Sequence, residues 1–151
     1  MTSFLEQLVG ESIDARDHRH HMIVGPTSND LAAKEGESLL LRGATLRGRM
    51  SGSSYVYAET VMVTSRLPPR FCLRLESSSD PIGRILDEMR IAVTREHLVE
   101  PDDFVAPQLN GSLKRGDYLL TRTYRIDSEP TPLMVVTEWF LKTLKPFLAS
   151  G

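Results

Sequence analysis

The chain has 151 residues, of which 40% are hydrophobic and 25% are charged, and it carries a formal net charge of −2 with a sequence pI near 6.1. A chain of this length can bury a hydrophobic core without disulfides or structural metal ions, so we expect a single domain over residues 1–151. The balanced charge and the lack of a basic stripe argue against a nucleic-acid partner. Cys72 is the sole cysteine, which excludes an intramolecular disulfide and a cysteine-based metal site.

The N-terminal residues and the apolar segments bear on the cellular compartment. Residues 1–20 have no basic leader, and their apolar stretch is broken by Glu6 and Gln7. Neither a signal peptide nor a spanning helix is therefore predicted there. No later segment approaches about 18 uninterrupted apolar residues. We expect a cytoplasmic protein with no membrane partner.

The first half of the chain predicts one helix followed by strands. Apolar side chains recur at helical spacing over residues 2–9, and Gly10 is placed to end that helix. Residues 12–24 have weak strand character. Residues 37–49 and 55–63 are clearer strands, and the turn-forming MSGSS between them predicts a hairpin.

The second half begins with two predicted helices. One starts near Pro68 or Pro69. The other is DPIGRILDEMR, in which Asp80 is the expected N-cap and Pro81 the first helical residue. Its apolar side chains recur along one face, which makes it the most legible helix of the chain.

Strands dominate the rest. Residues 91–99 have strand composition, and residues 118–127 and 132–141 predict a second hairpin. Residues 100–116 form a long irregular connection of the kind that is functional or disordered, and whether it closes over a ligand is left open. Five or six mostly antiparallel strands with two or three helices indicate an α+β fold, with one sheet and helices on one face. The other face must curl over a ligand or be covered by the long loops.

Glu138 stands inside the apolar segment PLMVVTEWFL, residues 132–141. Alternation along a strand places it on one face with Met134, Val136 and Phe140, and the other face is apolar as well. An ionised carboxylate is costly to bury without a partner, and desolvation raises a carboxyl pKa by up to about 3–5 units. Glu138 therefore borders a cavity that holds a cation, or it reaches water at a sheet edge.

Four other charged side chains also lie within predicted strands: Arg42, Glu59, Arg122 and Arg125. Each one alone is explained by a solvated strand face or by an ion pair within the sheet. Together they indicate something narrower, because arginine is suited to hold a planar carboxylate by two parallel hydrogen bonds. An arginine for a substrate carboxylate and a glutamate for proton transfer predict a site for a small acidic metabolite.

Other kinds of site have little support. His18, His20 and His21 alternate without an acidic or thiolate cluster, so we interpret them as an exposed polar face and predict no metal site. The glycine-containing segments lack the strand–turn–helix context of a phosphate loop. No serine sits in a nucleophile elbow, and no Cys and His pair is indicated.

Three segments, SDPIGRIL, RTYRI and PLMVVTEWF, together resemble the chorismate lyase family, and YVYAETVMVTSRLPPRF is similar to its middle strand and following helix. The resemblance covers about Thr2 to Leu144. It implies a six-stranded antiparallel sheet with helices on one side and an enclosed ligand site roofed by helical flaps. It also implies cofactor-free elimination of pyruvate from chorismate to give 4-hydroxybenzoate.

The resemblance implies roles at matching positions. The family's glutamate, which hydrogen-bonds the ring hydroxyl and is placed for proton transfer, falls on Glu138. Its arginine for the ring carboxylate falls on Arg42, and a backbone amide that contacts the same carboxylate falls on Ile82, at a helix N-terminus. Glu59 replaces a strand arginine of some family members. Glu59 and Arg125 are lesser substrate-binding candidates.

The substrate is left open. The chain begins about where the family has a Met-Thr pair beside the site, so a contact by Met1 or Thr2 is uncertain. Such a member could carry out another elimination, dehydration or cyclisation in a specialised pathway. Effector domains of winged-helix regulators have a similar fold and bind small acids without turnover, but no helix-turn-helix is evident here. We expect a small carboxylated substrate as the partner, and a monomer or homodimer.

Overall fold

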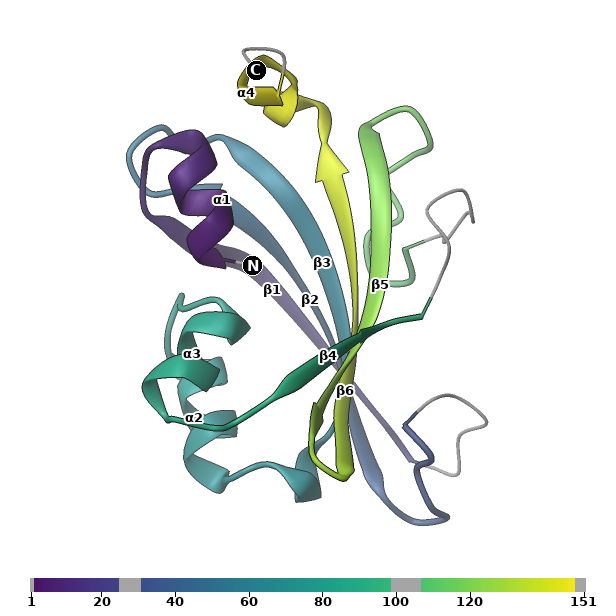
Figure 1. Cartoon of the computed structure of the whole chain (residues 1–151). Helices are drawn as coiled ribbons and strands as arrows, with labels where there is room; N and C mark the ends of the chain where they lie inside the picture. The colour runs from purple at the N-terminus through teal and green to yellow at the C-terminus, as the bar shows by residue number, and fades with distance from the viewer. Residues whose placement is uncertain (1, 25–30, 99–106, 149–151) are drawn as a thin grey trace.

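The computed structural model describes residues 2–24, 31–98 and 107–148. These residues form one antiparallel sheet of six strands, in the order β1-β2-β3-β6-β5-β4. Helices α1, α2 and α3 gather on one side of the curved sheet (Figure 1). The predicted α+β class, with one six-stranded antiparallel sheet and helices on one side, is therefore confirmed.

The predicted helices and strands occur in the predicted order, although the strand predicted over residues 91–99 spans only Thr94–His97. The strands are β1 (Ile13–Val24), β2 (Ser38–Gly48), β3 (Ser54–Val63), β4 (Thr94–His97), β5 (Tyr118–Ser128) and β6 (Thr131–Leu141). The α-helices are α1 (Thr2–Val9), α2 (Pro69–Ser77), α3 (Ile82–Glu88) and α4 (Lys145–Leu148). Two short 3₁₀ helices, η1 (Thr64–Arg66) and η2 (Lys142–Leu144), continue β3 and β6.

Glycines form two of the turns, one between α1 and β1 and one between β2 and β3. Gly10 has φ of 76° and its N–H donates to the Glu6 carbonyl at 2.9 Å, so it ends α1 in the left-handed conformation that favours glycine. Gly52, with φ of 71°, lies in the tight turn between β2 and β3. Both predicted hairpins form, β2 with β3 and β5 with β6.

The core lies between the helices and one face of the sheet. Side chains at alternate positions of the central strands pack on α2 and α3, and the main cluster includes Leu40, Met62, Met134, Phe71 and Ile85. A second cluster places Leu5 of α1 against the far end of β2 and β3. Burial of such side chains contributes about 1.5–3 kcal/mol each, which fixes the helices against this face.

Loop segments cover part of the opposite face. Leu31 and Ala33 pack with Leu39 and Val63, and all four are buried. Further along the sheet, the backbone of the loop after residue 107 bonds to the side chain of Glu59. The expectation that the loops cover this face therefore holds for these segments. Residues 99–106 of the predicted long connection lie outside the described residues.

The start of α3 differs from the prediction. Pro81, with φ of −62° and ψ of 151°, is the N-cap residue, and no side chain caps the helix. The Asp80 carboxylate instead accepts hydrogen bonds from Arg74 and Arg84. Two guanidinium groups compete with the backbone for this carboxylate, and charge-assisted bonds are the stronger ones. The expected capping role of Asp80 was therefore wrong.

Candidate active site

A small cavity lies between the helix-facing side of the sheet and the start of α3. Its volume is about 50 Å³, and its lining includes Arg42, Glu138 and Ile82. The strand register explains why space remains there. Ala44 of β2 pairs with Ala58 of β3, which pairs with Glu138 of β6, so two small side chains stand beside the glutamate in one row. Larger residues in that row would fill the cavity.

Arg42 is a buried cation without a carboxylate partner among the described residues. Its side chain belongs to a residue only 4% exposed, and its Nε has no hydrogen-bond partner there. Its Nη2 lies 3.0 Å from His18 Nε2, which in turn lies 2.8 Å from the Ala15 carbonyl oxygen. Because one ring nitrogen can accept from Arg42 or donate to Ala15 but not both, His18 offers at most one neutral acceptor.

Burial changes the pKa of Arg42. Desolvation lowers the pKa of its guanidinium to about 10, which still leaves it charged at neutral pH. A buried charge is normally paired or hydrogen-bonded, because its desolvation is costly. An anion entering the cavity would supply the missing partner. Burial of the His18 ring, together with the charge of Arg42, lowers the pKa of His18 and favours its neutral form.

Glu138 is the acidic group of the cavity. It is 3% exposed, and Oε1 accepts a 2.7 Å hydrogen bond from Nη2 of Arg122 on the neighbouring strand β5. Burial raises the pKa of the Glu138 carboxyl, while the charge of Arg122 acts in the opposite direction. A carboxylate with raised pKa is a better base near neutral pH than one in water. Glu138 thus combines proton-accepting chemistry with a fixed orientation.

Arg122 is a site residue that the sequence analysis noted as a charged strand residue but did not assign to the site. Its guanidinium lies 5.0 Å from the Tyr124 ring centre and 5.6 Å from that of Phe140, within the range of cation–π contacts. These rings and Glu138 hold the guanidinium in place. The sequence showed only that Arg122 lies in a predicted strand. It did not show the strand register that places Arg122 opposite Glu138.

Ile82 lies at the cavity together with Pro81 and Gly83, where α3 begins. Backbone N–H groups of a first helical turn have no partner within the helix, so they are available to an acceptor in the cavity. The structure thus brings Glu138, Arg42 and Ile82 to one cavity, as the family pattern implied.

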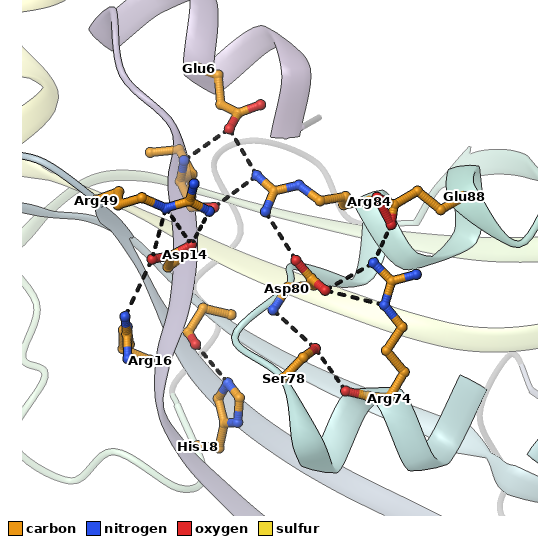
Figure 2. Close-up of polar contacts among 12 residues, drawn as sticks. Glu6, Asp14, Arg16, His18, Arg49, Arg74, Ser78, Asp80, Arg84 and Glu88 are labelled. Carbon is orange, nitrogen blue, oxygen red and sulfur yellow. Dashed lines mark hydrogen bonds and ion pairs between the residues drawn. The ribbon is translucent and has the colours of Figure 1, made fainter. Parts of the chain in front are cut away.

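A network of ion pairs holds the first turn of α3 in place (Figure 2). Asp80 accepts from Arg74 of α2 at 2.9 Å and from Arg84 of α3 at 3.2 Å. Arg84 also donates to Glu6 of α1 at 2.8 Å and to the Ile13 carbonyl of β1 at 2.9 Å. One arginine therefore ties the segment after Asp80 to both the first helix and the first strand.

The comparison with known proteins now decides the family. A family model described as "Chorismate pyruvate-lyase Rv2949c-like" matches residues 2–148. The chain belongs to this chorismate pyruvate-lyase family. The resemblance seen in its motifs is thereby confirmed.

Individual relatives agree with the family. The chorismate pyruvate-lyase of Mycobacterium tuberculosis (strain CDC 1551 / Oshkosh) is 32% identical over 111 residues, which cover 70% of this chain and 54% of the relative. That of Mycobacterium leprae (strain TN) is 27% identical over 125 residues, which cover 80% of this chain and 59% of the relative. The chain thus spans somewhat more than half the length of these relatives.

A solved structure was also found to be similar. It is a GntR-family transcriptional regulator from Bacillus cereus, with a TM-score of 0.46 and 14% sequence identity, covering 85% of this chain and 94% of that chain. A likeness at this score carries no weight for function, so the family assignment rests on the sequence matches.

Two candidate residues of this family member lie away from the cavity. Glu59 points to the opposite face of the sheet, because it is one residue removed from Ala58 and Thr60, which line the cavity. Its carboxylate accepts hydrogen bonds from the backbone N–H groups of Gln108 at 2.8 Å and Leu109 at 2.6 Å. It thus has partners within the chain, and we leave it out of the proposed site.

Arg125 is displaced from the cavity for the same reason. It follows Tyr124, which lines the cavity, and so lies on the other face of β5. Its guanidinium forms ion pairs with Asp127 at 2.7 Å and Glu96 at 2.6 Å. Both partners are carboxylates of the chain itself, so Arg125 is also left out of the proposed ligand site.

Other expectations about the site reach beyond what the structure describes. Met1 and residues 99–106, which include part of the loop considered as a lid, lie outside the described residues. His20 and His21 are exposed, in line with the expected polar strand face, whereas His18 is half-buried and lies against Arg42, so the expectation was wrong for His18. Among the described residues, no group of three His, Cys, Asp or Glu side chains is arranged to hold a metal, and no helix is long and apolar enough to cross a membrane.

Proposed function

We propose that this family member is a cofactor-independent lyase that eliminates pyruvate from chorismate and leaves 4-hydroxybenzoate. The observation that carries the proposal is the pairing within one cavity of Arg42, a buried cation lacking an anion, with Glu138, a buried carboxylate. An arginine that lacks a counterion suits a carboxylate substrate, and a buried glutamate suits proton transfer. The family relatives named chorismate pyruvate-lyases support the choice of substrate.

The reaction asks little covalent chemistry of the protein. Glu138 accepts the proton from C4 of the ring, the electron pair of that C–H bond completes the aromatic ring, and the C3–O bond to the enolpyruvyl group breaks. The leaving enolpyruvate takes up a proton on its methylene carbon and becomes pyruvate. Arg42 holds the ring carboxylate, with backbone N–H groups at Ile82 as further donors. Positioning and electrostatics therefore supply most of the catalysis.

The cavity must open for this substrate. A volume of about 50 Å³ is well below that of an engineered protein cavity that binds benzene, about 150 Å³. The ring of chorismate carries substituents and is larger than benzene. Tyr124 of β5 and residues 81–83 at the start of α3 both line the cavity, so we expect part of this lining to move outward on binding. The proposal therefore includes a rearrangement of the wall on binding.

The decisive experiment is an activity assay on the purified chain. Chorismate is added, pyruvate is followed by coupling to lactate dehydrogenase, and 4-hydroxybenzoate is measured by chromatography. We expect equal amounts of both products. Glu138→Gln should lower kcat at least about 100-fold, as loss of a general base does. Arg42→Met should raise KM strongly.

A matched control separates the site from general damage. Glu59→Gln makes the same change in a carboxylate that is also buried, 6% exposed against 3%, but on the other face of the sheet. It should retain most of the activity if the variant remains folded by circular dichroism. Absence of turnover by the wild-type chain would overturn the lyase proposal. Tight binding of 4-hydroxybenzoate without turnover would indicate a binding module instead.

A further inference from the structure

A large apolar groove adjoins the cavity. Its volume is about 700 Å³, and it is bounded by α1, by the C-terminal η2 and α4, and by strands β4, β5 and β6. Figure 1 shows α1 and α4 at the same end of the sheet. We call this space the apolar groove; its described walls include Phe4, Leu5, Leu120, Phe140 and Leu148.

The walls of the apolar groove expose hydrophobic side chains that a soluble domain normally covers. Phe4 is 65% exposed, Leu120 48% and Leu148 52%. These residues come from the first helix, a strand and the last helix, so the fold gathers them at one place from distant parts of the sequence. Contiguous exposed apolar surface of this kind marks binding sites. Its volume also falls within the range of small-molecule pockets, about 300–1,000 Å³.

The polar lining of the apolar groove is basic. Its described lining residues include Arg95, His97 and Arg122, and no aspartate or glutamate. Arg95 has neither a hydrogen bond nor an ion pair among the described residues. Arg122 uses Nη2 to bind Glu138, and its side chain, 35% exposed, lines the groove. Two arginines thus stand beside an apolar wall, and the guanidinium of Arg95 has no carboxylate paired with it among the described residues.

We propose that the apolar groove is a second ligand site, which binds a hydrophobic monocarboxylate with an alkyl or aryl-alkyl tail. The carboxylate is held by Arg95 and Arg122, and the tail lies against the leucine and phenylalanine side chains. Charge complementarity decides the class of ligand, because a cationic amphiphile meets two arginines and a neutral one leaves their donors unused. A second carboxylate on the tail would be desolvated against the apolar walls.

The apolar groove and the cavity use different arginines to hold an anion. Arg42 lines the cavity and is absent from the lining of the apolar groove, whereas Arg122 lines the groove. Arg95 and Tyr124 line both. Because the two spaces share a wall, a ligand in the groove would contact Arg122 while that arginine binds Glu138.

The test is a binding titration of the whole chain by calorimetry, with decanoate as the probe below its micelle concentration and no chorismate present. Decanol and decyltrimethylammonium, which share its tail, serve as the neutral and cationic comparisons. We expect decanoate to bind at one site per chain and at least about tenfold more tightly than either comparison. Arg95→Gln should weaken decanoate about tenfold, and Leu120→Glu should abolish measurable binding.

Two control variants make the result specific. Leu73→Glu changes a leucine that is 65% exposed on α2 and does not line the groove, so it should leave decanoate affinity unchanged. Arg42→Met should also leave it unchanged, which separates this site from the proposed active site. Loss of binding in Arg42→Met would place the carboxylate in the cavity and overturn the proposal.

Three other results would also overturn it. One is equal affinity for all three amphiphiles, which would mean non-specific binding to apolar surface. Another is equal weakening by Leu73→Glu and Leu120→Glu. The third is a wild-type dimer in light scattering that Leu120→Glu converts to a monomer, since a second copy of the chain would then cover the groove.

Discussion

The guanidinium of Arg122 on β5 lies 2.7 Å from the carboxylate of Glu138 on β6, and this contact opposes the burial of the glutamate. Burial is the stronger influence and raises the pKa of Glu138, while Arg122 lowers it. The contact therefore holds the carboxyl group closer to ionisation than its surroundings alone would. It also fixes the direction in which the carboxylate faces the cavity.

Removal of Arg122 should change the pH dependence of the proposed reaction. In Arg122→Met the lowering influence is lost, so the pKa of Glu138 rises further and less of the base is ionised at neutral pH. The acidic limb of the kcat/KM profile should move to higher pH, with a loss on the order of tenfold at pH 7. Arg122→Lys, which keeps a charge, should show a smaller displacement. Identical profiles for wild type and Arg122→Met would contradict this account.

Glu138 should make the folded state less stable as the pH rises. Because its folded-state pKa is raised, its contribution to stability is fully present below the ordinary value of 4.5 and is lost as the pH rises through the folded-state pKa. Glutamine at this position does not titrate. The free energy of unfolding of Glu138→Gln, relative to wild type, should therefore increase between pH 5 and pH 8. Urea unfolding measures this, and a difference that stays constant with pH would refute it.

Glu11 supplies a control of opposite sign for that experiment. Its carboxylate accepts hydrogen bonds from Ser51, Tyr55 and Met50, which together lower its pKa to about 2, with the Ser51 hydroxyl as the largest influence. Its stabilising contribution is present above pH 4.5 and is lost as the pH falls through the folded-state value of about 2. Glu11→Gln should therefore be destabilised at neutral pH and equal to wild type in strong acid.

The hairpins and helices could be predicted from local patterns, but the pairing of Arg122 with Glu138 could not. The turn between β5 and β6 pairs Ser128 with Thr131, and an unbroken register from there would place Arg122 opposite Thr137. An irregularity between Ile126 and Asp127 shifts the register by one residue. A one-residue shift exchanges the faces of a strand, so the partner of Glu138 depends on a bulge that the sequence does not announce.

For the candidate site residues, local patterns likewise did not show which side chains face the cavity. Alternation placed Glu138 among apolar side chains but left open whether it borders a cavity or reaches water, and the family motifs connected it with Arg42 and Ile82. Neither source of information located Glu59 and Arg125 relative to the cavity, because both are charged residues in strands like the others. Their faces became clear only when each strand was placed in the sheet, where Glu59 bonds to the Gln108–Leu109 backbone and Arg125 to neighbouring carboxylates.

Arg42 should cost stability in the absence of a ligand. It is buried with one neutral neighbour, His18, and no carboxylate partner among the described residues. Arg42→Met replaces this charge with an apolar side chain of similar length, and should raise the free energy of unfolding by on the order of 1 kcal/mol. In the wild type, 4-hydroxybenzoate should raise the melting temperature, since a ligand bound only to the folded state stabilises it. The variant should show no such rise. A destabilised variant that still responds to the ligand would contradict the assigned role.

Glu59 should hold the loop on the far face of the sheet. Its carboxylate accepts the N–H groups of Gln108 and Leu109 and the hydroxyl of Tyr57 at 2.8 Å, so one side chain satisfies three donors. Glu59→Ala leaves those donors without their acceptor, at about 1–3 kcal/mol for a buried group left unsatisfied. Hydrogen exchange at the Gln108 and Leu109 amides should become faster in this variant, with much smaller changes in β6. Glu59→Gln keeps one acceptor oxygen and should fall between. Unchanged exchange at both amides in Glu59→Ala would show that other contacts hold the loop.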